Sequence, residues 1–414
     1  MTKVIQRVRI LAGLLTLVML GSSLGAFAAP PAPKEIVIGA ALPLTGTFAR
    51  EGGYFKDGYE MAVKEVNERG GIFVKEYNKR IPVRLILYDD KSDATTSVSL
   101  YEKLVTEDKV HALLGGYSTP LIQAHTVVPE KYKVPYVNGG GASTAIYARG
   151  YKWIFGLLAS IEKLAITLMN WIASQQDAGK LGKPLRIAIA WENTSHGKDF
   201  QKGILDKARA SPDRFTIVFD EPFEIGSKDF TPLLQKVKAA NADAWLVDAR
   251  IADAILMQRQ LTELGLYFQV ISYGPRGTEK AIRDALGPAA DYIVSVNWWH
   301  RDLPYPQARA FVRKYEETYK KPAEWFPALA YETARVLFRA IEKAGSLDKA
   351  KIRDALAKMD MRGSIVVGQR VWFGPNGQID NDYVIMQNLP GRGPVLVYPK
   401  YVALGEAVVP IPKR

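Results

Sequence analysis

The chain has 414 residues, which is too long for one ordinary hydrophobic core, so we expect two to three domains. Its content of 48% hydrophobic and 24% charged residues excludes a disordered protein. The net charge of +12 is scattered among acidic residues instead of forming basic runs with interleaved aromatics, which argues against nucleic-acid binding.

Residues 1–28 have the pattern of a secretory signal peptide, with cleavage before Ala29. Three basic residues precede an apolar stretch from Ile10 to Leu20, which is well short of the roughly 20 residues that span a bilayer. Removing this leader lowers the net charge from +12 to +9. The chain has no cysteine, which excludes disulfides and a lipid-modified N-terminal cysteine. We therefore expect a periplasmic protein that is not lipid-anchored.

Short apolar runs alternate with helical patterns through the rest of the chain. In the first part we expect strands at 36–40, 83–87, 112–114 and 135–137, with a helix that ends near Tyr132 before the last of them. Strands at 186–191, 215–219, 244–248 and 269–272 follow, again separated by helices, among them 160–176, 197–210, 229–240, 252–264 and 278–286. The last third is more helical and ends in strands near 371–373 and 383–387. This alternation predicts an α/β protein with two Rossmann-like lobes and parallel-rich sheets.

Ligands of open parallel sheets bind beyond the carboxyl ends of the strands. The residues that follow the expected strands are hydroxyl-bearing and glycine-rich in the first half, as in Tyr117, Ser118, Thr119 and the run 139–144. In the second half, cationic and aromatic residues take these places.

Several motifs in one register resemble a known family. They include Pro43-Leu44-Thr45-Gly46, Gly70-Gly71-Ile72, Asp89-Asp90, Lys228-Asp229-Phe230 and Gly274-Pro275. Their order resembles the periplasmic solute-binding proteins of ABC importers, of the leucine/isoleucine/valine-binding type, over nearly the whole chain beyond the leader.

This resemblance implies two lobes joined by three hinge crossings, with the ligand in the cleft between them. One lobe would hold 35–155 plus 296–382, and the other 156–295 plus 383–414. Such proteins are not enzymes, and they deliver a small molecule to the membrane permease of an ABC importer. We expect a monomer without cofactor.

The resemblance also assigns candidate ligand contacts. In the family, two hydroxyl- and glycine-rich loops hold the carboxylate of an amino acid, and here these loops contain Ser118, Thr119, Gly140, Gly141, Ala142 and Ser143. The positions of two family aromatics fall at His196 and at or beside Arg250. The acidic residue that pairs with the amino acid's ammonium group falls at Arg276. Arg50, Glu51 and Tyr117 complete the candidate site.

An arginine in place of an acidic residue disfavours an ammonium group by about 1 to 4 kcal/mol and favours a carboxylate. We therefore expect a small organic acid. The expected cleft could be lined by aromatic residues, namely Tyr54, Tyr117, Trp191, Tyr273 and Trp298. These residues favour an aryl carboxylate, and a compact dicarboxylate is the competing ligand. Branched-chain or other amino acids or amides, a ligand-sensing module without transport, and an exported hydrolase remain alternatives.

Each candidate residue also has a structural alternative. Arg276 could pair with Glu279, Arg250 with Asp248 or Asp253, and Arg50 with Glu51 at the rim. Ser118, Thr119 and His196 could cap helices.

The sequence lacks the patterns of enzymes and metal proteins. Its four histidines show no metal-ligand spacing, and the glycine run 139–141 lacks the ending of a phosphate-binding loop. It has no Gly-x-Ser-x-Gly motif, and the adjacent Ser195 and His196 would point apart. We therefore expect no catalytic residues and no metal.

Overall fold

The computed structural model of the chain describes residues 31–413. The expected signal peptide, residues 1–28, lies outside the described residues. All elements described below belong to the compact unit of residues 32–414.

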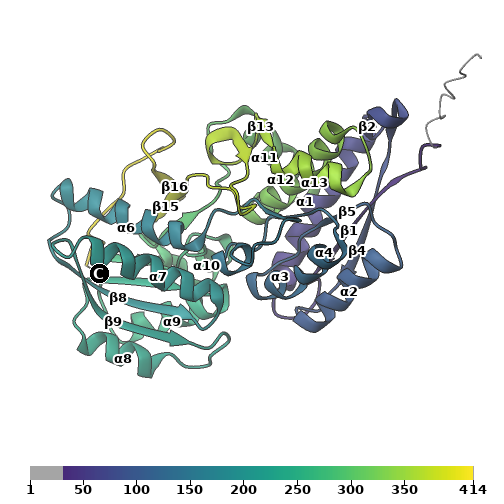
Figure 1. The fold of residues 1–414 in the computed structure, drawn as a ribbon. Coiled ribbons are helices and arrows are strands. Elements are labelled where there is room, and N and C mark those ends of the chain that lie inside the picture. The colour runs from purple at the N-terminus through teal and green to yellow at the C-terminus, as the bar shows by residue number, and fades with distance from the viewer. Residues whose placement is uncertain (1–30, 414) are drawn as a thin grey trace, which may run out of the picture. The chain divides into compact units, whose positions relative to one another are not determined.

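The first sheet has five parallel strands in the order β4-β1-β5-β6-β7 (Figure 1). They are β1 (Ile36–Leu42), β4 (Val83–Asp89), β5 (Ala112–Leu114), β6 (Tyr136–Asn138) and β7 (Ile154–Gly156). The β-branched start of β1 is buried, as expected of an inner strand that helices cover on both faces. Because the strands are parallel, the loops that follow β1, β5 and β6 leave the same edge of the sheet.

Helices from both ends of the chain accompany this sheet. They are α1 (Ala49–Glu68), α2 (Ala94–Thr106), α3 (Thr119–His125), α4 (Val127–Tyr132), α5 (Thr144–Tyr147), α11 (Pro306–Tyr319), α12 (Trp325–Ala344) and α13 (Lys349–Ala357). Helix α12 is buried along most of its length and packs against α1 and β6. The first part of the chain and the helical last third therefore pack together around the five-stranded sheet.

The second sheet has seven strands in the order β16-β15-β12-β11-β10-β8-β9. They are β8 (Leu185–Glu192), β9 (Phe215–Phe223), β10 (Ala244–Asp248), β11 (Val270–Ser272), β12 (Val294–Asn297), β15 (Val384–Leu389) and β16 (Gly393–Tyr398). The strands from β9 to β12 are parallel, and β15 and β16 extend the sheet in antiparallel pairing.

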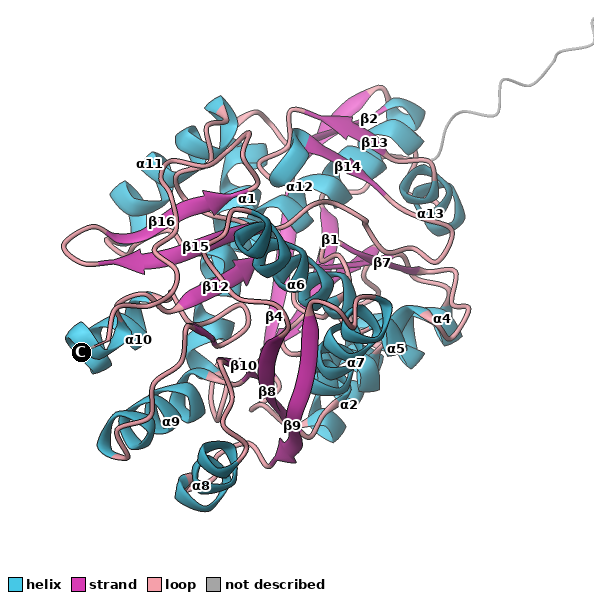
Figure 2. Cartoon of the chain, turned by 90° about the vertical axis from the view of Figure 1, so that its left-hand side faces the viewer, coloured by secondary structure: helices cyan, strands magenta, loops and turns pink. Residues whose placement is uncertain are grey.

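Helices lie on both faces of this second sheet. Figure 2 shows α6 (Ile161–Asp177) and α7 (Ser195–Ala210) on one side of β8 and β9. The other side carries α8 (Thr231–Ala239), α9 (Ile251–Glu263) and α10 (Lys280–Leu286). These two sheets with covering helices confirm the expected fold class.

The chain passes between the two sheets three times, after β7, after β12 and before β15. Side chains tie these crossings together. The Trp298 indole donates a hydrogen bond to the Ala159 carbonyl at 3.0 Å, and the Gln378 amide donates to the Leu158 carbonyl at 2.9 Å. The Tyr383 hydroxyl donates to the Ser160 carbonyl.

Several elements differ from the sequence-based expectations. The helix expected to end near Tyr132 is divided at Thr126 into α3 and α4. The strand expected near 371–373 is β14 (Arg370–Trp372), which pairs with β13 (Asp360–Arg362) in a separate hairpin. A second hairpin joins β2 (Ile72–Val74) and β3 (Lys79–Ile81). Among residues 31–413, no helix has the length and apolar character needed to cross a membrane.

Candidate ligand-binding site

Polar side chains from the carboxyl ends of both sheets meet at Tyr117. This residue follows β5, whereas Arg250 and Arg276 follow β10 and β11 of the other sheet. The Tyr117 hydroxyl accepts hydrogen bonds from Arg250 Nη1 at 3.2 Å and from Arg276 Nη2 at 3.3 Å. All three residues are buried. The topology thus brings together residues that lie 133 and 159 positions apart in the sequence.

Arg276 does not stand as an unopposed cation. Its Nη1 lies 3.5 Å from Asp248 Oδ1 and donates a hydrogen bond of 3.3 Å to the Ala249 carbonyl. Burial opposes the charged form, but Tyr117 and Asp248 outweigh burial and raise the pKa of Arg276. We expected Arg276 to replace the negative charge of the family's acidic residue by a positive one. This change is incomplete, because Asp248 at the end of β10 places a carboxylate opposite the Arg276 guanidinium. The alternative pairing with Glu279 is not formed among the described residues.

Arg250 pairs with Glu192, at the end of β8, and not with Asp248 or Asp253. Its Nη2 donates to Glu192 Oε1 at 2.7 Å, and its Nε lies 2.7 Å from Oε2. The guanidinium also lies over the Phe48 ring, 5.1 Å from the ring centre. Burial acts to lower the pKa of Arg250, but the Glu192 carboxylate outweighs burial and raises it.

His196 faces the same carboxylate as Arg276. Its Nδ1 lies 2.5 Å from Asp248 Oδ2, and the cap of helix α7 is the hydroxyl of Thr194, which accepts from Gly197 N–H. Burial acts to raise the pKa of Asp248, but His196 and Arg276 outweigh it and lower the pKa. The guanidiniums of Arg250 and Arg276 balance the charges of the carboxylates of Glu192 and Asp248.

These carboxylates and His196 also form a group whose potential metal-ligand atoms lie within 4.8 Å of one another. Each carboxylate already faces a guanidinium, however, so an additional cation would be repelled by Arg250 and Arg276. The arrangement is better suited to hydrogen bonding with a ligand than to holding a metal.

Ser118 and Thr119 lie at the start of helix α3, beside Tyr117. Ser118 is the residue before the helix but makes no capping bond, and its buried Oγ has no hydrogen-bond partner among the described residues. Buried hydroxyls are normally paired, so this oxygen is available to a ligand. Thr119 Oγ1 accepts a long bond of 3.4 Å from Ala142 N–H.

The run from Gly140 to Ser143 packs closely against the same loop. A β-carbon at Gly140 would lie 2.2 Å from the Gly116 carbonyl, so only glycine allows this approach. Gly141 N–H is already used by Asn138 Oδ1 at 3.1 Å, and Ser143 Oγ accepts from Ala145 N–H to cap α5. The loop therefore has a structural role in addition to the expected ligand role.

Arg50 and Glu51 begin helix α1 and belong to a neighbouring charged group. Arg50 pairs with Glu279 at 2.9 Å and with Glu324 at 2.5 Å, and Glu51 is more distant at 3.6 Å. The expected pair of Arg50 and Glu51 is therefore the weakest of three. Glu279 lies between β11 and α10, on the side of the second sheet. Arg50, in helix α1, therefore forms an ion pair between the part around the first sheet and the part around the second.

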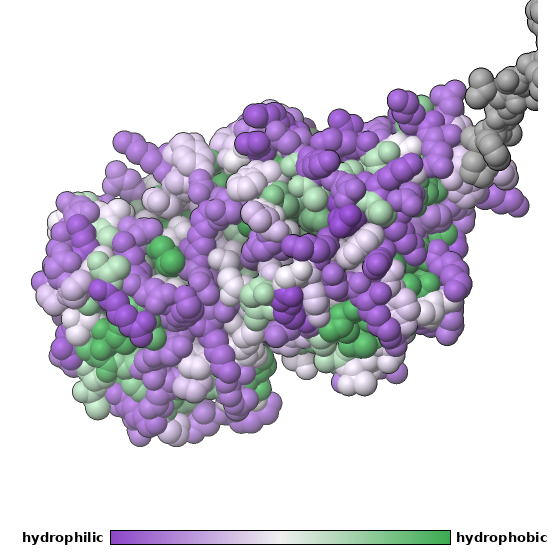
Figure 3. Space-filling model, in the orientation of Figure 1, coloured by the Kyte–Doolittle hydropathy of each residue, from purple (hydrophilic) through white to green (hydrophobic). Residues whose placement is uncertain are grey.

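Further hydrogen bonds join the two parts beside the site. Thr144 N–H donates to Asp199 Oδ2 at 2.8 Å, and Ser195 Oγ donates to Gln123 Oε1 at 2.8 Å. The parts around the two sheets are therefore in contact beside the candidate residues, so the structure is in a closed form. Figure 3 shows an indentation at the lower edge of the molecule, between the two parts that Figure 1 separates.

Most aromatic residues expected near the cleft make their polar contacts elsewhere. The Trp191 indole donates to Asp220 at 2.8 Å, and the Tyr273 hydroxyl donates to Gln258 at 3.1 Å. Trp298 belongs to the tied crossings. The aromatic neighbours of Tyr117 are instead Phe48, Phe55, Phe326 and Trp325, with ring centres 5.8, 5.8, 5.6 and 6.5 Å away. The sequence pattern does not single out any of these four residues as an aromatic contact.

Two α/β layers whose strand ends face one polar cluster define a two-part ligand-binding protein. The periplasmic binding protein family matches residues 35–392, and the chain belongs to this family. The family resemblance seen in the sequence is thereby confirmed.

Curated relatives match along most of their length. A Leu/Ile/Val-binding protein homolog 7 of Brucella abortus is 25% identical over 392 residues, which cover 92% of this chain and 96% of the relative. A Leu/Ile/Val-binding protein homolog 8 of Brucella suis is 24% identical and is covered to the same 96%.

Solved structures share the fold. The branched-chain amino acid transporter substrate binding protein of Streptococcus pneumoniae, in complex with isoleucine, aligns with a TM-score of 0.76 at 22% identity, covering 88% of this chain and all of that one. A solute binding protein of an ABC transporter from Rhodopseudomonas palustris, in complex with 3,4-dihydroxy benzoic acid, aligns with a TM-score of 0.74 at 19% identity, covering 92% and 99%.

Proposed function

We propose that this chain is the periplasmic solute-binding protein of an ABC importer and that it captures a small organic acid, preferably an aryl carboxylate. The ligand would be enclosed between lobes of 35–155 plus 296–382 and of 156–295 plus 383–414. The closed protein, a monomer, would deliver the ligand to the importer's permease. Family membership supports the transport role, and the polar cluster supports the ligand class.

The observation that carries the ligand class is the convergence of two buried guanidiniums on Tyr117 beside the unpartnered Ser118 Oγ. Burial raises the pKa of Tyr117, although Arg276 and Arg250 oppose this shift, so its hydroxyl keeps its proton at neutral pH. The cluster thus offers guanidinium N–H and hydroxyl donors from both sheets. A carboxylate is the ligand group that satisfies such donors best.

Among residues 31–413, Asp248 does not make a short contact with the guanidinium of Arg276. Arg276 makes only long contacts, 3.3 Å to Tyr117 and Ala249 and 3.5 Å to Asp248. A ligand carboxylate that shortens these contacts would gain charge-assisted hydrogen bonds, each worth about 1.5–3 kcal/mol. Asp248 would keep His196 as its partner.

An aromatic body is favoured by the rings around Tyr117. Phe48 and Phe326 meet Tyr117 in edge-to-face geometry, and Phe48 also lies under the Arg250 guanidinium. The Rhodopseudomonas palustris relative, whose ligand is 3,4-dihydroxy benzoic acid, is consistent with this preference.

An amino acid is the second candidate ligand. Asp248 Oδ1 is buried without a hydrogen bond among residues 31–413, and a carboxylate oxygen of this kind could accept from an ammonium group. The relatives' names and the isoleucine complex from Streptococcus pneumoniae favour this candidate. In that case Arg276 would act as the counter-ion of Asp248 and not as a ligand contact.

A thermal-stability screen against benzoates, dicarboxylates and amino acids, followed by calorimetry, separates these candidates. A ligand at 100 times its dissociation constant adds about 2.7 kcal/mol to the free energy of unfolding. We expect the largest shift with an aryl carboxylate and the loss of that shift in Arg276→Glu. Arg209→Glu, on the exposed face of α7, is the matched control. Tight leucine binding without any organic-acid binding would contradict the aryl carboxylate proposal and support the second candidate.

A further inference from the structure

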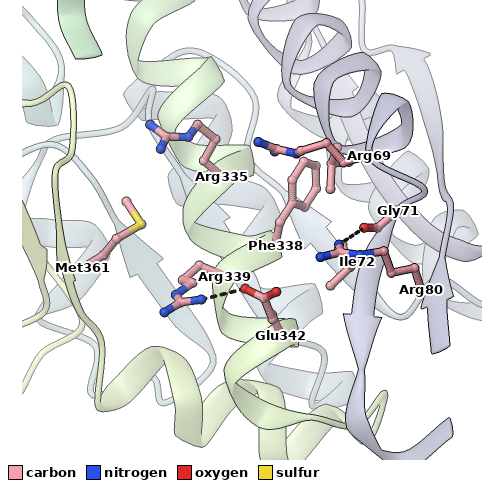
Figure 4. A pocket seen from close by; sticks show the side chains of 10 residues that line it. Arg69, Gly71, Ile72, Arg80, Arg335, Phe338, Arg339, Glu342 and Met361 are labelled. Atoms are coloured by element: carbon pink, nitrogen blue, oxygen red, sulfur yellow. Dashed lines mark hydrogen bonds and ion pairs between the residues drawn. The ribbon is translucent and has the colours of Figure 1, made fainter. Parts of the chain in front are cut away.

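A separate pocket lies where the end of α1, the β2–β3 hairpin, α12 and β13 meet (Figure 4). Its volume is about 330 Å³, within the range of small-molecule sites. Four arginines line it, and none of its lining residues belongs to the polar cluster described above. Figure 4 shows Arg69 and Arg80 on one wall and Arg335 and Arg339 on the α12 wall.

The arginines of the two walls differ in how their charges are balanced. On α12, Arg335 pairs with Glu332 and Arg339 with Glu342, each at 2.6 Å. Arg80 donates only to the Gly71 carbonyl at 2.9 Å. Within residues 31–413, neither Arg69 nor Arg80 forms an ion pair. The pocket therefore carries two uncompensated positive charges.

The two arginines without an ion pair, Arg69 and Arg80, would both attract an anion that enters the pocket. Arg69 and Arg80 come from two further elements and face the same space (Figure 4). Guanidiniums bind carboxylates and phosphates in bidentate geometry, so the pocket is suited to such an anion.

The floor and the far wall of the pocket are apolar. Phe338 is almost fully buried between the arginines, and Ile72 and Met361 add apolar surface from β2 and β13. Phe338 and Ile72 are already buried, so the apolar surface that still faces water is mainly that of the half-buried Met361. An inorganic anion would leave this surface exposed, whereas an anion with an apolar body would cover it.

We propose that this pocket is a second ligand site, which binds a small amphiphilic anion consisting of a phosphate or carboxylate on an aryl or short alkyl body. The site is independent of the proposed transport ligand, because it shares no residue with the cluster around Tyr117. Arg69 and Arg80 hold the anionic group, and Phe338 and Met361 contact the apolar body.

Calorimetry on the full chain with phenyl phosphate, and with inorganic phosphate as a comparison, tests this site. We expect phenyl phosphate to bind at least tenfold more tightly than inorganic phosphate and to weaken with added salt. The double variant Arg69→Ala, Arg80→Ala should lose at least tenfold in affinity. Lys64→Ala with Lys79→Ala is the matched control, since it removes two positive charges from the same α1 and β3 without touching the pocket.

Two further variants separate this site from the polar cluster around Tyr117. Arg276→Glu, in the cluster, should leave phenyl phosphate binding unchanged. Met361→Glu, in the pocket, should abolish this binding by placing a negative charge beside the apolar body. The proposal is overturned if phenyl phosphate gives no binding at millimolar concentration, if the arginine double variant binds normally, or if Arg276→Glu alone removes binding.

Discussion

At the scale of single residues, three carboxylates share the guanidinium of Arg50. Glu279 and Glu324 lie at ion-pair distance and Glu51 lies close by, with Glu279 fully enclosed. Burial and the neighbouring Glu324 raise the pKa of Glu279 to about 8, although Arg50 lowers it. One positive charge cannot balance three negative ones, so a proton on Glu279 relieves the excess.

We expect Glu279→Gln to reduce the pH dependence of stability. The unfolded chain releases this proton near pH 4.3, whereas the folded chain holds it to about pH 8. Between these values the folded state binds more protons, so the free energy of unfolding of the natural chain falls as the pH rises, by at most about 1.4 kcal/mol per pH unit. The Gln variant lacks this decrease.

Urea denaturation at pH 5, 6.5 and 8 measures this effect. Glu60→Gln on the exposed side of α1 is the control and should follow the natural chain. Parallel pH profiles for the natural chain and Glu279→Gln would show that Glu279 is ionised throughout this range.

The sequence predicted which residues come together in the candidate site, but it did not predict which carboxylates pair with the two arginines. Arg276, Arg250, His196 and Tyr117 follow predicted strand ends, so the rule for parallel sheets brings them together. The carboxylates that oppose the two arginines depend on which strands are neighbours. Strand β10 lies between β8 and β11, which places Asp248 beside Arg276, and this order is set by packing across the whole sheet. Asp248 itself ends a predicted strand, and that position was the available signal.

At the scale of elements, the close packing of α1 against α12 depends on Gly58. A β-carbon there would lie 2.5 Å from the Pro327 carbonyl and 2.7 Å from the Ala330 β-carbon. Gly53, on the same helix, has open space where its β-carbon would be. A larger residue can therefore be accommodated at position 53 but not at position 58 without moving the helices.

We expect Gly58→Ala to destabilise the chain by about 1–3 kcal/mol, because the two helices must separate. Gly53→Ala should stabilise it by up to about 1 kcal/mol, since alanine favours the helix. Thermal unfolding of both variants checks this pair, and an equal effect of the two substitutions would contradict the packing argument.

The long strands and helices could be predicted from the sequence because each has a continuous apolar pattern. Most strands that the sequence pattern did not predict are short, as in β7 with Ile154-Phe155-Gly156 and β12 with Val294–Asn297; β16 (Gly393–Tyr398), with six residues, is an exception. A run of this length carries no periodicity, and only its neighbours in the sheet make it a strand. The break at Thr126 between α3 and α4, by contrast, has a signal in the sequence. Pro129 has no N–H to donate to the carbonyl of His125, four residues earlier, so a continuous helix is interrupted there.

At the scale of the whole molecule, a few contacts hold the two sheet layers closed. Arg50 of α1 reaches Glu279, Thr144 reaches Asp199, and the Arg250 and Arg276 side chains reach Tyr117. A ligand that adds contacts to both layers would shift the balance further towards closure.

We expect Arg50→Ala to favour an open form, because it removes the link and leaves Glu279 and Glu324 facing each other. Small-angle X-ray scattering should show a larger radius of gyration for the free variant and a return to the natural value with saturating ligand. The apparent affinity should weaken at least twofold. Lys56→Ala, exposed on the same helix, is the control and should scatter like the natural chain. An unchanged radius of gyration in Arg50→Ala would contradict this role.

The hydrogen bonds among the three crossings have a mechanical consequence. Because the indole of Trp298, the amide of Gln378 and the hydroxyl of Tyr383 all attach to successive carbonyls at 158–160, the connections cannot swing independently. We therefore expect these bonds to resist twisting and sliding of one half against the other and to favour bending. The guanidiniums of Arg250 and Arg276 would then meet Tyr117 in the same geometry each time the two halves close.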